Sequence, residues 1–279
     1  MKADLHVHSS YSDGSDGIPE LVEQLERAGV DIFALTDHDT IAGCVEMQEL
    51  IPPQIKFIPS VELTCRAGDI KCHILGYNCN PKNKTLTDLI EKGKVLRRKK
   101  LETRIGYLKD AWNIDLTEEE RAWLYSRRSV VKTHLANILV NRGLAGDNVS
   151  AMKKYLDGCK TGDTRFTGEE GIAAIMAAGG VPVWAHPLGG EGEEHLSDEE
   201  FLPKLEVMKN FGIKGLECYY SRYNFEEINF LVECANKNGL LISGGSDYHG
   251  TNKNIPLLRL NCEDVPVYSD KLTLLQHVC

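Results

Sequence analysis

The chain has 279 residues, of which 42% are hydrophobic and 26% charged, and its formal net charge is −9. These values predict a soluble protein with a sizeable core, and the negative charge argues against a protein that wraps duplex nucleic acid. A small phosphorylated ligand fits this charge, because the charge around a site decides its binding. No apolar stretch reaches 18 residues, so no membrane contact is expected. The nine cysteines are scattered without a CxxC pair, which is typical of free thiols in the cytoplasm.

Seven short apolar runs have the length and composition of β-strands. In chain order they cover residues 3–7, 32–36, 56–63, 70–77, 180–185, 215–219 and 240–244. Helical patterns occur over residues 19–28, 168–178, 199–211 and 225–238. Strands that alternate with helices are typical of a parallel α/β architecture.

The alternation stops between about residues 86 and 162, where the periodicity is helical and no strand pattern occurs. We therefore expect a helical insertion domain at 84–162, while residues 1–83 and 163–279 form the main domain. Residues 92–132 hold 12 Lys and Arg against six acidic residues, so this segment carries +6 and the rest of the chain −15. Arg97, Lys100 and Arg104 share one stripe of a predicted helix. This stripe either clamps a phosphate or is an ordinary solvated face.

Residues of the types that bind metal ions fall at or near the carboxyl ends of most predicted strands. They are His6, His8, Asp13, His38, Glu62, His73, His186, Asp247 and His249. His6 and His8 alternate along one strand, so both imidazoles lie on the same face. In parallel β/α barrels the active site forms at the carboxyl ends of the strands. Nine ligands are too many for one ion and suit two or three divalent ions, namely Mn, Fe or Zn, with Mg also compatible.

These motifs resemble the PHP (polymerase and histidinol phosphatase) family. The matching segments are residues 3–9 (ADLHVHS), 12–14 (SDG), 35–39 (LTDHD), 61–62 (VE), 185–187 (AHP) and 245–250 (GSDYHG). The resemblance implies a distorted seven-stranded β/α barrel and a metal-dependent phosphoesterase. It also implies three metal positions: His6, His8, Glu62 and Asp247; then Glu62, His73 and His186, with Glu62 bridging; then Asp13, His38 and His249.

Within that family, residues 131–136 (VKTHLA) look like the insertion motif of the nucleoside 3',5'-bisphosphate phosphatases, also described as 5'–3' oligoribonucleases. Lys132 stands where Arg is usual in that group. The resemblance implies a nucleotide substrate: AMP, a nucleoside 3',5'-bisphosphate or a 5'-phosphorylated oligoribonucleotide. Arg97, Lys100 and His134 are then expected to contact its phosphate groups.

Phosphate monoesters resist attack because they are anionic, and metal ions both neutralise this charge and activate water. We therefore expect a metal-bridging hydroxide, positioned by Glu62, to attack phosphorus. No G-x-S-x-G elbow occurs, which disfavours a serine nucleophile. Three alternatives stay open: a histidinol-phosphate phosphatase, a 3'–5' proofreading exonuclease and a non-catalytic metal-binding module of the same fold.

Overall fold

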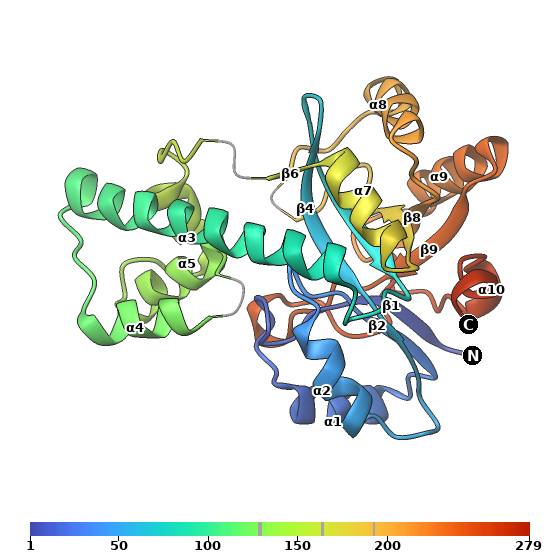
Figure 1. Ribbon diagram of the computed structural model, residues 1–279, viewed down its shortest axis with the longest axis horizontal. Coiled ribbons are helices and arrows are strands. Elements are labelled where there is room, and N and C mark those ends of the chain that lie inside the picture. The colour runs from blue at the N-terminus through green and yellow to red at the C-terminus, as the bar shows by residue number, and fades with distance from the viewer. Residues whose placement is uncertain (128–129, 163–164, 192) are drawn as a thin grey trace.

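The computed structural model describes residues 1–127, 130–162, 165–191 and 193–279 (Figure 1). Its strands are β1 (Ala3–Val7), β2 (Ile32–Leu35), β3 (Lys56–Pro59), β4 (Val61–Ala67), β5 (Ile70–Tyr77), β6 (Phe166–Thr167), β7 (Val181–Trp184), β8 (Gly215–Tyr220) and β9 (Leu241–Gly245). Its helices are α1 (Ile18–Ala28), α2 (Ala42–Leu50), α3 (Lys84–Trp112), α4 (Glu118–Ser126), α5 (Lys132–Asn141), α6 (Asn148–Ala151), the π-helix η1 (Met152–Leu156), α7 (Gly168–Ala177), α8 (Asp198–Asn210), α9 (Phe225–Asn238) and α10 (Leu275–Val278). The described residues also form two 3-10 turns, η2 (Gly250–Asn252) and η3 (Ser269–Lys271).

Local signals in the sequence mark the ends of the predicted helices. Helix α1 starts with Pro19 in its first turn and ends at Gly29, whose φ of 68° is left-handed. Helix α9 begins with a capping box between Asn224 and Glu227. The four helices predicted outside the insertion are confirmed, with ends shifted by at most one residue.

The strands form a parallel sheet of order β1-β2-β3 and a mixed sheet of order β6-β4-β5-β7-β8-β9. The mixed α/β class is therefore confirmed, but the architecture is not purely parallel. Strand β5 is antiparallel to both β4 and β7. The predicted strand 56–63 was wrong as a single strand, because it consists of β3 and β4 in different sheets. Buried Ser60 separates them, and its hydroxyl donates to the carbonyl oxygen of Ile58 at 3.0 Å.

Strand pairing gives two sheets, so closure into a seven-stranded barrel stays a prediction. The sheets nevertheless meet at two places. The backbone N–H of His8 donates to the Tyr248 oxygen, and the N–H of Asp247 donates to the His6 oxygen, both at 2.9 Å. A parallel bridge also joins His38 to Glu62. Side chains of β1, β2, β3, β5 and β7 share one buried cluster with α10.

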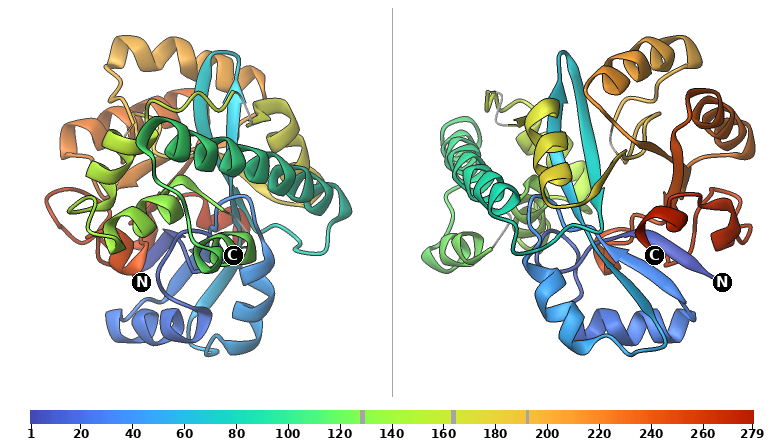
Figure 2. Two further views of the ribbon diagram at one scale, coloured as in Figure 1. Left: turned by 90° about the vertical axis from the view of Figure 1, so that its left-hand side faces the viewer. Right: turned by 45° about the vertical axis from the view of Figure 1, so that its right-hand side comes forward.

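A larger core packs α1, α2, α7, α8 and α9 against the outer faces of the two sheets. Figure 2 shows α1 and α2 together on the side of the three-stranded sheet, away from α7, α8 and α9. Helices α3 to α6 and η1 lie beside the sheets (Figure 1). The described residues of the segment 84–162 include no strand.

The helical segment has a hydrophobic cluster of its own, built from the far half of α3, from α4 to α6 and from η1. The near end of α3 is different, because Leu86 and Ile90 belong to the core around the sheets. Helix α3 therefore ties the two parts together, and the domain boundary at residue 84 stays a prediction. No helix among the described residues is both long and apolar enough to cross a membrane.

Candidate metal centre

All nine predicted ligand residues converge at one end of the sheets. The residues come from β1, from the loops that follow β1, β2, β7 and β9, and from β4 and β5. They are His6, His8, Asp13, His38, Glu62, His73, His186, Asp247 and His249. Seven of them are buried, and only His38 and His73 are partly exposed. The carboxyl ends of the parallel strands β1, β2, β7 and β9 explain most of this arrangement. Glu62 and His73 are different, because Glu62 lies at the start of β4 and His73 lies within β5, which is antiparallel to β4 and β7.

The carboxylate of Glu62 lies at the centre of the cluster, and its two oxygens face different imidazoles. Oε2 lies 3.3 Å from His6 Nε2 and 3.2 Å from His8 Nε2. Oε1 lies 2.9 Å from His73 Nδ1 and 3.3 Å from His186 Nε2. One carboxylate thus contacts two groups of imidazoles, which is the geometry of a bridging ligand.

Two aspartates complete the cluster. Asp247 Oδ1 lies 3.5 Å from His6 Nε2 and 3.3 Å from His8 Nε2. Asp13 Oδ1 lies 3.2 Å from His249 Nε2 and 4.0 Å from His38 Nε2. Close groups of possible ligand atoms are His8–Asp13–His38–His249, His6–His8–Asp247 and His38–Glu62–His73. The last group differs from the expected one, because His38 Nδ1 is also 3.0 Å from Glu62 Oε2 and stands in place of His186.

The cluster has the donor set and the unsatisfied atoms that divalent ions require. Seven of its buried side-chain atoms have no hydrogen-bond partner among the described residues: His6 Nε2, His8 Nε2, Asp13 Oδ1, His38 Nδ1, Glu62 Oε2, His73 Nδ1 and His249 Nε2. Buried polar atoms normally have a hydrogen-bond or metal partner, so seven such atoms without one at a single place indicate a bound group such as a metal ion. Imidazole nitrogens and carboxylate oxygens fit Mn, Fe, Zn or Mg.

The imidazoles and carboxylates strongly perturb one another. Burial alone would lower the pKa of His8, but Asp247 and Glu62 outweigh it and raise this pKa to about 9. Burial would likewise raise the pKa of Glu62, but His38, His73 and His6 hold it well below its usual range. Glu62 therefore stays ionised at neutral pH and is ready to bind a cation.

Two residues of the cluster have strained backbones. His186 has a φ of 29° and Asp247 a φ of 59°, in the left-handed region that non-glycine residues rarely adopt. Such a conformation costs about 1–3 kcal/mol and persists where surrounding contacts enforce it. Strain of this kind gathers at functional sites, and here it turns both side chains toward Glu62 and His6.

Two cavities border the cluster on the side of the helical segment. A central cavity of about 600 Å³ lies between the cluster, α6 and η1, and Val149, Met152 and Lys253 line it. A smaller cavity of about 200 Å³, which we call the basic pocket, is lined by Asp13 and His38 and by the side chains of Arg97, Lys100, Arg104, Lys132 and Arg165. Cationic groups therefore border the cluster on the side of the helical segment.

Comparison with known proteins identifies the family. The sequence profile of the PHP domain matches residues 4–159. The chain belongs to the PHP family. It is a metal-dependent phosphoesterase, as its relatives and its clustered His, Asp and Glu residues agree.

Two relatives and one solved structure resemble this PHP protein over most of its length. A 5'-3' exoribonuclease from Haemophilus influenzae is 31% identical, over 89% of this chain and 90% of its own. A 3',5'-nucleoside bisphosphate phosphatase from Chromobacterium violaceum is 26% identical, over 88% and 86%. A protein of Bifidobacterium adolescentis, assigned as a metal-dependent phosphoesterase, superposes with a TM-score of 0.82 and 25% identity, over 99% of this chain and 94% of its own.

The residues predicted to contact substrate in this PHP protein lie in different surroundings. Arg97 donates from Nε to Asp39 Oδ2 at 2.7 Å and from Nη2 to Thr64 Oγ1 at 2.9 Å, at the wall of the basic pocket. Lys100 lines the same pocket. His134 is buried, and its Nδ1 accepts a hydrogen bond from the Val131 N–H at the start of α5. Its pKa falls to about 4, chiefly because of burial.

Three residues that were not predicted, the buried Glu217 and Tyr220 and the partly buried Lys253, hold the PHP ligands in place. Glu217 on β8 accepts from His6 Nδ1 and from the His186 N–H, each at 2.8 Å. Lys253 Nζ lies 2.7 Å from Asp247 Oδ2, and the Tyr220 hydroxyl donates to the same oxygen at 3.0 Å. The acidic Glu217 within an apolar strand was the available signal, because an isolated buried charge needs a partner.

The chain also contains a Cys-x5-Arg pattern that was not predicted. Cys159 and Arg165 have the Cys-x5-Arg spacing of phosphatases with a cysteine nucleophile, although residues 163–164 between them lie outside the described part of the chain. Burial raises the pKa of Cys159, and its Sγ lies 3.8 Å from the Thr103 oxygen. A reactive cysteine needs a lowered pKa, so the geometry around Cys159 disfavours a nucleophilic role.

Proposed function

We propose that this protein is a phosphatase that removes phosphate from small nucleotides, with AMP and nucleoside 3',5'-bisphosphates as substrates. The observation that carries the proposal is the basic pocket beside the buried cluster. Arg97, Lys100 and Arg104 lie on α3 with their side chains at this pocket, next to Asp13 and His38. The whole chain has a net charge of −9, but cationic side chains gather at the basic pocket, so this pocket is suited to an anion.

Two or three divalent ions would occupy the cluster, namely Mn, Fe, Zn or Mg. His6, His8, Glu62 and Asp247 would hold the first, and Glu62, His73 and His186 the second. Asp13, His38 and His249 would hold the third. When bound, such ions neutralise the phosphoryl charge and supply an activated water at neutral pH.

The protein's own residues would orient the substrate. Arg97 is held by Asp39, whose other oxygen accepts from the Thr64 N–H at 2.8 Å, so its guanidinium has a fixed direction. Its remaining N–H groups would bind non-bridging phosphate oxygens, with Lys100 beside it. His134 would not contact the substrate. Its hydrogen bond with the Val131 N–H would instead fix the turn that brings Lys132 and Thr133 to the basic pocket.

Two features favour nucleotides over other small phosphates. The relatives are named as an exoribonuclease and a nucleoside bisphosphate phosphatase. The central cavity has an apolar side formed by Val149 and Met152, which suits a base, and the basic pocket suits a second phosphate. A bisphosphate would place one phosphate at the cluster and the other in the basic pocket.

We also propose that the two sheets close into the distorted barrel implied by the resemblance. The support comes from the backbone hydrogen bonds between His6, His8 and the segment after β9, and from the bridge between His38 and Glu62. The helical segment at 84–162 would then be the substrate-binding insertion of that barrel.

A phosphate-release assay on the Mn-loaded protein tests this function. The panel contains AMP, adenosine 3',5'-bisphosphate, histidinol phosphate and a 5'-phosphorylated oligoribonucleotide. We expect release from the nucleotides that is lost in His186→Ala. The matched control is His195→Ala, because His195 is exposed and pairs with Glu227 at 2.8 Å away from the cluster.

Other outcomes would replace the proposal. Release from histidinol phosphate alone would retain the metal chemistry and overturn the nucleotide substrate. Bound metal without release from any substrate would favour the non-catalytic module.

A further inference from the structure

Lys253 places a cationic group at the outer edge of the cluster. Its Nζ donates a hydrogen bond to Asp247 Oδ2 at 2.7 Å. The other oxygen of that carboxylate, Oδ1, faces the imidazoles of His6 and His8 at 3.5 and 3.3 Å. The ammonium group therefore lies on the side of Asp247 that points away from the imidazoles.

The ammonium group of Lys253 has donor capacity that the described residues do not use. An ammonium group has three N–H donors, and among the described residues only Asp247 accepts a hydrogen bond from this one. Glu191 Oε2 lies 4.0 Å from Nζ, beyond hydrogen-bond distance, and Glu191 Oε1 lies 3.1 Å from Arg222 Nη1. Lys253 can therefore donate to a ligand as well as to Asp247.

The loop that carries Lys253 is attached to the loop after β1. Asn252 Nδ2 donates to the backbone oxygen of Asp13 at 2.8 Å. Gly250 has a left-handed φ of 63°, and a Cβ at this position would collide with Ser15 Oγ, so the two loops approach each other closely. These contacts fix the backbone before Lys253 relative to the cluster, so its ammonium group is in place before a ligand binds.

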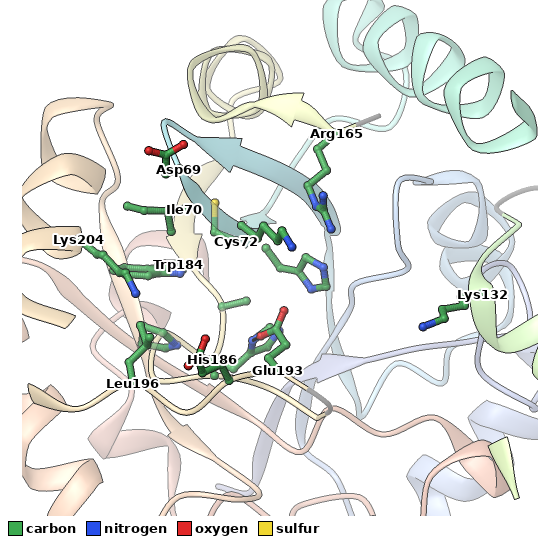
Figure 3. A pocket seen from close by; sticks show the side chains of 16 residues that line it. Asp69, Ile70, Cys72, Lys132, Arg165, Trp184, His186, Glu193, Leu196 and Lys204 are labelled. Atoms are coloured by element: carbon green, nitrogen blue, oxygen red, sulfur yellow. Dashed lines mark ion pairs between the residues drawn. The ribbon is translucent and has the colours of Figure 1, made fainter. Parts of the chain in front are cut away.

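Lys253 lines one of the three cavities that border the cluster. The third cavity, of about 630 Å³, lies beside the β4–β5 hairpin, and Figure 3 shows Lys204 and Lys132 on opposite sides of it. Among their described lining residues, neither this cavity nor the basic pocket includes Lys253. The central cavity does, together with Val149 and Met152. Lys253 therefore acts on a group that enters the central cavity, which is the side suited to the organic part of the substrate.

The direction of the reaction brings the leaving oxygen toward Lys253. In a displacement at phosphorus, the attacking and leaving oxygens lie roughly in line. Water that attacks from the side of Glu62, at the centre of the cluster, displaces the ester oxygen outward into the central cavity. Negative charge develops on that oxygen as its bond to phosphorus breaks, and a fixed cationic donor beside it lowers the energy of the transition state.

From these relationships we propose that Lys253 is a catalytic residue that donates a hydrogen bond to the ester oxygen as it leaves. This inference rests on the proposed phosphatase function and adds a residue to its reaction. The oxygen of water bonds to phosphorus, and the bond between phosphorus and the ester oxygen breaks. The ester oxygen keeps the bonding electron pair and takes a proton from solvent, so the products are inorganic phosphate and an alcohol. Lys253 remains an ammonium ion throughout.

Esters whose leaving groups differ in basicity test this role. A strongly basic leaving oxygen needs stabilisation, whereas a weakly basic one, such as 4-nitrophenolate, needs little. In the Mn-loaded protein we expect Lys253→Met to lower kcat for AMP by about 100-fold, the usual loss for one transition-state donor, and kcat for 4-nitrophenyl phosphate by less than about fivefold. Across a series of phenyl and alkyl phosphates, log kcat/KM should fall more steeply with leaving-group basicity in Lys253→Met than in wild type.

Two further variants complete the comparison. Lys253→Arg keeps a cationic donor, so we expect it to retain the wild-type dependence on leaving-group basicity. Lys214→Met has the same charge change as Lys253→Met at an exposed residue immediately before β8, and it should match wild type on every ester.

The affinity for Mn separates this role from a structural one that acts through Asp247. The Tyr220 hydroxyl also donates to Asp247 Oδ2, at 3.0 Å, so this oxygen keeps a partner in Lys253→Met. Competition with a chromogenic chelator should therefore show an affinity within about tenfold of wild type, below the usual loss for a residue that orients a ligand.

Several outcomes would overturn the inference. An equal loss on every ester would show that Lys253 does not act on the leaving oxygen, and unchanged rates on every ester would show that it does not take part. If the wild type hydrolyses phenyl and alkyl phosphates but no nucleotide, the nucleotide substrate is wrong, and the phenyl and alkyl series still decides the role of Lys253. Release of phosphate from no ester would overturn both the proposed function and this inference.

Discussion

Glu217 Oε1 accepts a hydrogen bond from His6 Nδ1 at 2.8 Å, although the two residues are 211 positions apart in the chain. Its other oxygen accepts from the His186 N–H, also at 2.8 Å. The buried carboxylate of Glu217 therefore holds both His6, which faces Glu62 Oε2, and His186, which faces Glu62 Oε1. Because the Nδ1–H of His6 donates to Glu217, the lone pair of His6 Nε2 faces the centre of the cluster.

Glu217→Gln should weaken metal binding by about 10- to 100-fold, the usual effect of losing a carboxylate that orients a ligand. A carboxylate offers two acceptors, whereas a carboxamide offers only one, so one of the two hydrogen bonds must be lost. Competition with a chromogenic chelator measures the affinity. Glu226→Gln, at an exposed position of α9, is the control. Unchanged affinity in Glu217→Gln would show that this carboxylate does not orient the ligands.

Metal removal should both inactivate and destabilise the protein. Without ions, the buried atoms of the cluster lack partners, and an ion at 1,000 times its Kd stabilises a folded protein by about 4 kcal/mol. We expect the Tm to rise when Mn is added to chelator-treated protein, and to rise much less in Glu62→Gln. An equal rise in both proteins would mean that the ion binds elsewhere.

Arg97→Ala should raise KM for adenosine 3',5'-bisphosphate by roughly tenfold or more, because a charge-assisted hydrogen bond to phosphate is lost. Arg98→Ala is the matched control, since this neighbouring arginine is exposed and donates to the Tyr125 oxygen at 3.1 Å. Initial rates over a range of substrate concentrations separate KM from kcat. Equal effects of the two substitutions would exclude a specific role for Arg97.

His134 should make stability depend on pH. Its pKa is about 4 in the folded protein and 6.5 in the unfolded chain, so acid favours unfolding between these values. The stability due to neutral His134 is present above pH 6.5 and is lost as the pH falls toward 4. Between pH 7.5 and 5.0 the free energy of unfolding should fall by about 2 kcal/mol more in wild type than in His134→Gln.

Denaturant unfolding at the two pH values measures this difference, with His277→Gln as an exposed control. If wild type and His134→Gln lose the same stability, His134 is not the group that titrates.

The strand pattern shows where prediction from sequence succeeds and where it stops. The ends of β1 and β5 were predicted to the residue, because alternating apolar residues and flanking turns are local signals. The break at Ser60 was missed, since residues 56–63 are a continuous β-like run and the change of partner from β2 to β5 is not a local property. The antiparallel pairing of β5 with β7 was missed for the same reason.

The sequence by itself predicted the chemistry of the candidate centre, because it places His and carboxylate residues at or near the ends of most predicted strands. Their convergence around Glu62 agrees with that prediction in every one of the nine residues. Tertiary structure decided what surrounds them. The hydrogen bond of Glu217 with His6 and the hydrogen bond of Arg97 with Asp39 join residues far apart in the chain. Such contacts depend on how whole elements pack, and no local pattern in the sequence records that packing.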